Sequence, residues 1–258
     1  MILAIDVGNT NVVIGCVEDG KVYKTVRIRT EHNSTAAEYA IKLKSLLEVF
    51  EIDPHSFEGA VMSSVVPTVS ISISIAVKLI TDLECLNVGP GVKTGMNLKI
   101  DDPSTVGCDL VVGGVAAIGC YSVPAIIMDL GTATTITLVD ESRSFRGGAI
   151  IPGLRLSYAA LASGTSLLPE ISISAPGKVI ATNTVDCMRS GAVYGTAAMI
   201  DGMIDRMEAE IGQKCTLIAT GGLASAIIKN CSHEIIYDAD LILKGLWIIY
   251  QKNRKQKN

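Results

Sequence analysis

An α/β protein made of two similar halves is the fold class that the sequence predicts, on three observations. First, 48% of the 258 residues are hydrophobic but only 4% are aromatic, a composition that suits buried parallel strands covered by helices. Second, "ILAIDVGNTN" (2–11) and "IIMDLGTATT" (126–135) share one pattern: an apolar stretch ending in Asp, one apolar residue, Gly, and small polar residues. Third, each copy opens the same succession of elements, three strands followed by alternating helices and strands. Together these observations predict an internal duplication.

In the first half, three strands precede a helix. The turn sequences "DVGNTN" and "EDGK" separate the strands, and Ser34 or Thr35 is a suitable N-cap for a helix whose apolar residues recur at helical spacing. We expect strands at 2–7, 11–17, 21–29, 59–66 and 85–89, and helices at 34–50, 69–83 and 108–121. The last of these helices is rich in small residues and follows the glycine-rich loop "GPGVKTGMN" and the irregular segment "IDDPSTVG".

The pattern restarts at residue 125. We expect strands at 125–130, 134–140, 145–151, 215–222 and 234–237, and helices at 153–164, 184–211, 223–230 and 241–253. The chain is therefore expected to divide into two lobes, 1–118 and 119–258, each with its own Asp-x-Gly turn.

Charge and hydropathy exclude several classes of protein. The formal net charge of −4 offers no basic surface for nucleic acid or for an anionic membrane. Asp6 interrupts the N-terminal apolar run, so no signal peptide is expected, and no apolar run approaches the ~20 residues that cross a bilayer. We expect a soluble, cytoplasmic protein that binds neither nucleic acid nor membrane.

The spacing of the seven cysteines predicts neither a disulfide scaffold nor a zinc site. Their number is odd and no pair has C-x-x-C spacing, so reduced thiols in the core are expected. His32, His55 and His233 lie in separate polar segments, and we do not expect them to form a catalytic or metal-binding set.

The repeated Asp-x-Gly turn brings together groups that suit a polyphosphate and its metal. The carboxylate can hold a hard cation, and Gly lets the backbone approach a phosphate. Backbone N–H groups and the hydroxyls of Thr10, Thr132 and Thr134 can donate to phosphate oxygens. A plain hairpin turn explains either copy alone, but two copies at equivalent points of a repeat favour phosphate binding. A third segment, Thr220-Gly221-Gly222 after a strand, leaves room for a flat or bulky group such as a nucleoside.

This set of motifs resembles the actin-like ATPase and sugar kinase superfamily, whose two ribonuclease-H-like lobes flank a cleft and each contribute an Asp-Gly phosphate turn. Order, spacing and size resemble the type III pantothenate kinases in particular. The segments that carry the resemblance span essentially the whole chain: "DVGNTN" (6–11), "GPGVKTG" (89–95), "VGCD" (106–109), "DLGTATT" (129–135), "GGAIIPG" (147–153), "LLP" (167–169), "NTVDCMRSGAVYG" (183–195) and "TGG" (220–222). The resemblance implies ATP-dependent phosphorylation of pantothenate to 4'-phosphopantothenate, the first step of coenzyme A biosynthesis.

The resemblance also implies roles for individual residues. Asp109 matches the general base and Asp129 the ligand of a monovalent cation, K⁺ or NH₄⁺, while Asp6 is expected to handle Mg²⁺. The implied ATP-binding residues are Asp6, Val7, Gly8, Asn9, Thr10, Asn11, Val12, Val13, Thr132, Gly221 and Gly222. The implied pantothenate-binding residues are Gly107, Cys108, Asp109, Leu110 and Thr184. Family members are homodimers with sites near the subunit interface.

Asp109 can serve such a role chemically. Phosphoryl transfer needs positioning and charge neutralisation more than a strong base, and a carboxylate can orient the hydroxyl and accept its proton late. An N-cap of the helix that follows "DPSTVG" is the alternative reading of Asp109, and both can hold.

Two departures from the family pattern keep other functions open. The family usually has Arg where this chain has Leu110, and commonly an aromatic residue where it has Ile100, so a natural partner for the pantothenate carboxylate is missing. Lys93 or Arg189 are candidates to replace it. The alternatives are a kinase for another small hydroxy acid and a regulatory accessory protein of the same fold.

The expected long helix carries small residues about four apart, which leave a nearly smooth face: Gly191, Gly195, Ala198 and Gly202. Either a dimer contact or close packing within one subunit accounts for this face.

Overall fold

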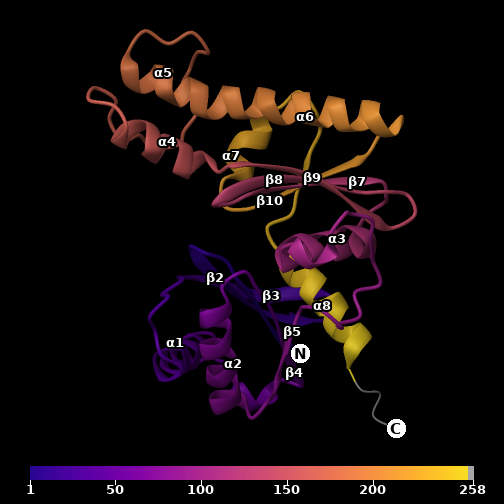
Figure 1. Cartoon of the computed structure of the whole chain (residues 1–258). Coiled ribbons are helices and arrows are strands. Elements are labelled where there is room, and N and C mark those ends of the chain that lie inside the picture. Colours follow the sequence, from indigo (N-terminus) through magenta and orange to yellow (C-terminus); the bar gives the residue numbers. More distant parts are fainter. Residues whose placement is uncertain (255–258) are drawn as a thin grey trace. The chain divides into compact units, whose positions relative to one another are not determined.

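The computed structural model describes residues 1–254 as two compact units (Figure 1). Unit 1 comprises Met1–Asn97, Asp101–Cys120 and the C-terminal residues from Asp240. Unit 2 comprises Leu98–Ile100 and Tyr121–Ala239. Among the described residues, no helix is both long and apolar enough to cross a membrane.

Unit 1 is built on a five-stranded sheet with the order β3-β2-β1-β4-β5. β1 pairs antiparallel with β2 and parallel with β4. The strands are β1 (Ile2–Val7), β2 (Asn11–Glu18), β3 (Lys21–Arg29), β4 (Gly59–Ser64) and β5 (Cys85–Asn87). The helices are α1 (Ala36–Val49), α2 (Pro67–Thr81), α3 (Cys108–Cys120) and α8 (Leu241–Asn253), with 3-10 turns at Pro54–Ser56 and Pro103–Thr105.

Helix α1 forms where the cap and the apolar spacing predict it. Thr35 is the N-cap and forms a reciprocal capping box with Glu38, which satisfies two free N–H groups at the helix start. Tyr39, Leu43 and Leu47 follow at four-residue spacing and are buried. They join the cluster that α1 and α2 build on one face of the sheet, which includes β1 residues Leu3, Ile5 and Val7.

Unit 2 contains a six-stranded sheet with the order β11-β10-β7-β8-β9-β6. The strands are β6 (Asn97–Leu98), β7 (Ala125–Leu130), β8 (Ala133–Val139), β9 (Ser144–Pro152), β10 (Thr216–Thr220) and β11 (Ile236–Tyr237). The helices are α4 (Leu154–Ser163), α5 (Thr184–Ser190), α6 (Thr196–Ile211) and α7 (Ala224–Ile227), with a π-helical turn at Gly191–Gly195 and a 3-10 turn at Ile228–Asn230. The expected helix 184–211 is thus a single helical run that contains a π turn between α5 and α6.

The two sheets confirm the predicted duplication. β7, β8, β9, β10 and β11 occupy the same places and directions as β1, β2, β3, β4 and β5. The register irregularity between Cys16 and Val17 in β2 also has a counterpart between Leu138 and Val139 in β8. A bulge at the same point of both repeats is a feature of the fold and not an accident of one copy.

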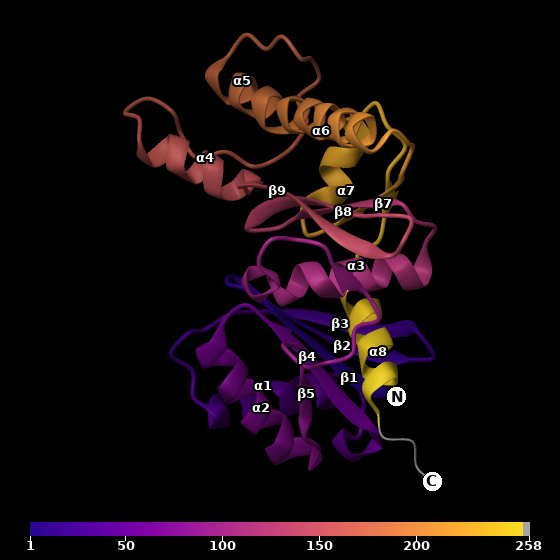
Figure 2. The same cartoon turned by 45° about the vertical axis from the view of Figure 1, so that its right-hand side comes forward.

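The predicted division at residues 118 and 119 is wrong for the C-terminal helix. Helix α8 belongs to unit 1 and runs beside α3 in both views (Figures 1 and 2). Gly245 lets α8 approach so closely that a Cβ atom there would collide with the Val112 carbonyl oxygen of α3. Residues 98–100 also cross over, because β6 pairs at the edge of the unit 2 sheet. Local sequence patterns predict neither the place of α8 in unit 1 nor that of residues 98–100 in unit 2, because both depend on contacts with distant residues.

Gly245→Ala is expected to lower the free energy of unfolding of unit 1 by about 1–3 kcal/mol, although Ala favours a helix, because the added Cβ overpacks the contact with Val112. Gly89→Ala is the control, since a Cβ there meets nothing within 4 Å. Chemical denaturation of both variants measures the difference. Equal midpoints would contradict the close packing of α3 and α8.

Candidate active site

Asp6 lies at the end of the central strand of unit 1, on a face set by strand alternation. Leu3, Ile5 and Val7 point to the cluster under α1 and α2, so Asp6 points to the opposite face, where α8 contacts β1 and α3 contacts β4. Its Oδ1 accepts a hydrogen bond of 2.6 Å from the Ser63 hydroxyl, the residue that pairs with Asp6 in β4.

Burial raises the pKa of Asp6 from its ordinary 3.8 to about 6. The Ser63 hydroxyl lowers this pKa, the nearby negative charge of Asp109 raises it, and the positive charge of Arg27 lowers it. Asp6 is therefore a poorly solvated carboxylate that a cation would stabilise.

Hydrogen bonds hold the base of the turn after Asp6, and the tip of the turn is exposed. Its Gly8 N–H donates to the Asn11 carbonyl at 2.9 Å. Thr30 fastens the turn to the end of β3: its hydroxyl donates to the Gly8 carbonyl at 2.7 Å and its N–H to the Thr10 carbonyl at 2.9 Å. Asn9 and Thr10 are exposed at the tip.

Val7 and Val12 differ from the other expected loop residues. Both are fully buried in the unit 1 core, so their side chains are not available to a ligand.

Asp109 approaches Asp6 from the first turn of α3. Residue 108 opens the helix, and the Leu110 and Val111 N–H groups donate to the Gly107 carbonyl, so Gly107 is the N-cap and the N-cap reading of Asp109 is wrong. The Asp109 carboxylate also accepts from the Leu110 N–H at 2.9 Å, so this N–H is shared between Asp109 and the Gly107 carbonyl. A Cβ at residue 107 would collide with the Asp109 carboxylate.

Two features set the chemistry and position of Asp109. Burial raises its pKa, although the Leu110 N–H lowers it. Cys108 ties the start of α3 to the end of β4, because its Sγ accepts from the Ser64 N–H at 3.1 Å and donates to the Ser64 carbonyl at 3.0 Å. Burial also raises the pKa of this thiol to about 11, so Cys108 is a protonated packing residue.

The second turn, in unit 2, is a shorter version of the first. Asp129 pairs with Thr220 of β10, as Asp6 pairs with Ser63. The Gly131 N–H donates to the Ala133 carbonyl at 3.0 Å, so this turn has one residue fewer than the first. The Gly153 N–H holds the turn through the Thr132 carbonyl at 3.1 Å, and a Cβ on Gly153 would collide with that oxygen.

Gly221 lies directly over Asp129. Its φ is +96°, and an added Cβ would lie 2.5 Å from Asp129 Oδ1 and 2.7 Å from the Leu130 backbone. Only glycine therefore fits beside the carboxylate at this point. Gly222 follows it and is exposed.

The remaining expected residues lie on different elements. Leu110 is half-buried in α3, Ile100 lies beside Gly147 in unit 2, and Thr184 is the first residue of α5. Arg189 donates to Ser172 at 3.0 Å and pairs with Asp186 at 3.4 Å, and its Nε is buried without a hydrogen-bond partner among the described residues. The expected cleft depends on how one unit sits against the other, and it stays a prediction.

Sequence reasoning missed Ser63, Ser64 and Thr30, which hold the first site together. Ser63 and Ser64 end the apolar strand "GAVMSS". Aligning the two halves would have found these two serines. They lie beside β1 at the places that Thr220 and Gly221 occupy beside β7.

Solved structures share this two-unit fold. The chain matches a putative 2-dehydro-3-deoxygalactonokinase from Sinorhizobium meliloti (TM-score 0.58, 10% identity, 100% of this chain and 99% of the other). It also matches component A of the (R)-2-hydroxyglutaryl-CoA dehydratase from Acidaminococcus fermentans (TM-score 0.56, 14% identity, 96% of each chain). A Baf family protein from Campylobacter jejuni, described as a putative transcriptional activator, is similar at 18% identity (TM-score 0.57, 97% and 98% covered). Together, the fold and the paired turns are those of the actin-like ATPase and sugar kinase fold class.

Sequence comparison identifies the family within that class. The type III pantothenate kinase profile matches residues 2–206. Type III pantothenate kinases of Halalkalibacterium halodurans and Bacillus cytotoxicus are 42% and 40% identical, each over 98% of this chain and over 100% and 97% of their own lengths. The chain belongs to the type III pantothenate kinase family.

Asp6→Asn is expected to raise the free energy of unfolding at pH 7.5 by about 1–3 kcal/mol. The raised pKa means that the folded state binds the proton more tightly than the unfolded state, so ionisation above pH 6 costs stability, and this cost is lost as pH falls toward 3.8. The gain is therefore expected to shrink at pH 5. Denaturation at both pH values measures it against Asp101→Asn, an exposed carboxylate of the same unit. A variant that is less stable at both pH values would contradict the buried charge.

Gly221→Ala is expected to destabilise unit 2 more than Gly212→Ala does. Both glycines have positive φ, which costs Ala about 1–2 kcal/mol at either position, but only at Gly221 does Cβ meet the Asp129 carboxylate. Thermal and chemical unfolding of both variants measures the two losses of stability. Because the backbone strain is common to both variants, the difference between the losses reports the collision with Asp129. Equal losses would mean that the turn moves away from Asp129 at little cost.

Proposed function

We propose that this chain phosphorylates pantothenate to 4'-phosphopantothenate with ATP, the first step of coenzyme A biosynthesis. The observation that carries the proposal is the convergence of Asp6 and Asp109, from β1 and α3, in a chain of the type III pantothenate kinase family. Transfer of a phosphoryl group between two bound substrates needs such a site, with one carboxylate for the metal–nucleotide side and another for the acceptor hydroxyl.

The turn from Asp6 to Val13 is the proposed ATP phosphate loop. The backbone at exposed Asn9 and Thr10 offers N–H groups, and the Thr10 hydroxyl is a further donor for phosphate oxygens. Asp6 is the residue that would hold Mg²⁺, directly or through its waters, which fits a buried carboxylate in need of a counter-charge. Bound Mg²⁺ supplies neutralisation of the phosphate charge.

Asp109 is the proposed general base. Its carboxylate orients the primary hydroxyl of pantothenate and takes its proton as the bond to phosphorus forms. Because burial raises its pKa, it holds that proton better than an exposed carboxylate does. The proposed pantothenate contacts around Asp109 are Gly107, Cys108 and Leu110. The Cys108–Ser64 contacts fix this segment against the end of β4.

The other proposed ligand-binding residues belong to unit 2. Asp129 is the proposed ligand of K⁺ or NH₄⁺, and Thr132, Gly221 and Gly222 are proposed ATP contacts on the nucleoside side. The close approach of Gly221 to Asp129 supports a compact turn in which no side chain at residue 221 crowds the Asp129 carboxylate.

A homodimer is part of the proposal. Gly191, Gly195 and Ala198 are exposed along the continuous α5–α6 run, and a Cβ at Gly195 would meet nothing within 4 Å. Packing within the subunit accounts for Gly191, which faces the Tyr158 hydroxyl, but not for Gly195. Thr184, at the start of α5, is the proposed pantothenate contact on the same helical run.

Leu110 favours one alternative, a kinase for another small hydroxy acid. This residue stands where the family usually has an Arg for the substrate carboxylate, so an acceptor with a different end group remains compatible with the catalytic residues. A regulatory accessory protein is the third reading, and intact Asp6, Asp109 and Asp129 argue against it.

The deciding experiment is ADP release from Mg-ATP by the purified protein, with and without pantothenate, in K⁺ and in Na⁺ buffer. Turnover that requires pantothenate and K⁺ supports both the substrate and the role of Asp129. ATP binding without pantothenate-dependent turnover would overturn the proposed substrate, and other hydroxy acids in the same assay would then test the alternative.

Asp109→Asn is expected to reduce kcat at least 100-fold while ATP binding stays within about twofold, since general-base contributions typically reach 10²–10⁴. Asp101→Asn is the matched control on the loop before α3. ADP release gives kcat, and calorimetry gives the affinity for ATP. Near-normal kcat in Asp109→Asn would exclude it as the base.

A further inference from the structure

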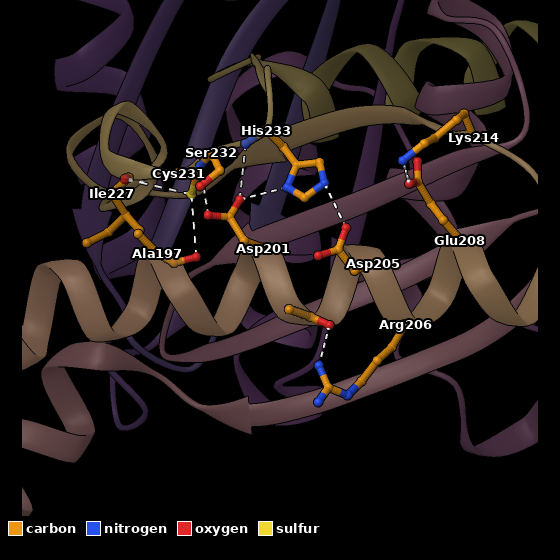
Figure 3. A network of polar contacts seen from close by, with 11 residues as sticks. Ala197, Asp201, Asp205, Arg206, Glu208, Lys214, Ile227, Cys231, Ser232 and His233 are labelled. Carbon is orange, nitrogen blue, oxygen red and sulfur yellow. Dashed lines mark hydrogen bonds and ion pairs between the residues drawn. The ribbon is translucent and has the colours of Figure 1, made fainter.

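One face of α6 gathers three carboxylates around a histidine from a distant loop (Figure 3). Asp205, Glu208 and His233 each offer one ligand atom, and these atoms lie within 4.8 Å of one another. His233 Nε2 is 3.1 Å from Asp205 Oδ1, and His233 Nδ1 is 2.8 Å from Asp201 Oδ1. An imidazole nitrogen with two carboxylate oxygens at this separation matches the ligand sets of divalent transition metals.

We propose that Asp205, Glu208 and His233 form a binding site for a divalent transition metal of the Zn²⁺ type. The proposal is independent of the pantothenate kinase reaction. Nitrogen and oxygen ligands within one cluster distinguish this group from the all-oxygen sites that Mg²⁺ and Ca²⁺ prefer.

Asp201 acts as a positioning residue for the histidine. Its carboxylate accepts the Ser232 N–H at 2.7 Å and the His233 N–H at 3.2 Å, so the loop backbone holds it in place. It faces Nδ1 of the ring, which directs Nε2 toward Asp205 (Figure 3). A carboxylate behind the imidazole is the usual support of a metal-bound histidine, because it fixes the ring and makes its other nitrogen a better ligand.

The proposed ligands contact one another and Lys214. Both ring nitrogens of His233 face carboxylates, Nδ1 that of Asp201 and Nε2 that of Asp205. Lys214 Nζ lies 2.6 Å from Glu208 Oε2, with 83% of the lysine side chain exposed against 7% for the glutamate. Zn²⁺ would bind His233 Nε2, with any proton on that nitrogen released to solvent, and would replace the exposed lysine beside Glu208.

The position of the cluster indicates a structural metal. The Cys215 N–H donates to Glu208 Oε1 at 2.9 Å, and Cys215 directly precedes β10, whereas Gly221 directly follows it. The length of the strand, roughly 20 Å over these six steps, separates the cluster from Asp129 and Gly221. A metal here would connect α6 to the loop after α7, which carries His233, while Glu208 already binds the segment before β10.

Calorimetric titration of the EDTA-treated full-length protein with Zn²⁺, without ATP, tests the site. We expect one Zn²⁺ per chain, with affinity reduced at least tenfold in His233→Gln and in Glu208→Gln, and unchanged in Glu210→Gln, an exposed carboxylate on the same helix. Asp201→Asn is expected to weaken Zn²⁺ 10–100-fold. Zn²⁺ is also expected to raise the Tm of the parent protein but not of His233→Gln.

Exposed thiols at Cys120 and Cys187 are the competing Zn²⁺ ligands. Co²⁺ in place of Zn²⁺ distinguishes them, because the proposed site gives no sulfur-to-cobalt charge-transfer band. Equal Zn²⁺ affinity in the parent and His233→Gln, or a strong charge-transfer band, would overturn the proposal. If Zn²⁺ does not bind and His233→Gln only lowers the Tm, the cluster is an ion-pair contact and the metal site is likewise excluded.

Discussion

A carboxylate at the end of the central strand of each sheet is the constraint on which the candidate site depends. Strand alternation places Asp6 and Asp129 on the face opposite the main apolar cluster of their units. Parallel pairing then puts the end of the neighbouring strand beside each carboxylate, Ser63 in unit 1 and Thr220 in unit 2. Without this pairing the turns would carry the same residues but no converging groups.

In unit 1 that constraint creates a site that opposes folding and favours ligand binding. The pKa values of Asp6 and Asp109 are both raised by burial, and the charge of Asp109 raises that of Asp6 further. Two desolvated like charges destabilise the free protein, and a bound cation or an accepted proton relieves them. The Cys108–Ser64 contacts and the Thr30 hydrogen bonds hold the surrounding backbone in place against this repulsion.

The two copies of the turn differ in length and in the residue that lies beside the carboxylate. The first turn is one residue longer and carries exposed Asn9 and Thr10 at its tip. The second is tighter, and Gly221 occupies the place that Ser64 holds in unit 1. In unit 1 the backbone N–H and carbonyl of Ser64 bind the Cys108 thiol of α3, whereas in unit 2 Gly221 leaves room for the Asp129 carboxylate beside the backbone. Duplication thus supplied two carboxylates, and small local changes gave their turns different geometry.

The sequence by itself predicted most of the strands and helices, the duplication and the family, and it singled out Asp6, Asp109 and Asp129 as candidate site residues. These follow from local apolar spacing, turn residues and short motifs, which neighbouring residues alone decide. Only the tertiary structure placed α8 in unit 1, joined Ser63 and Ser64 to Asp6 and Cys108, and brought His233 to α6. Each of these contacts joins residues tens to hundreds of positions apart. Their partners are chosen by strand pairing and helix packing, which leave no periodic trace in the chain.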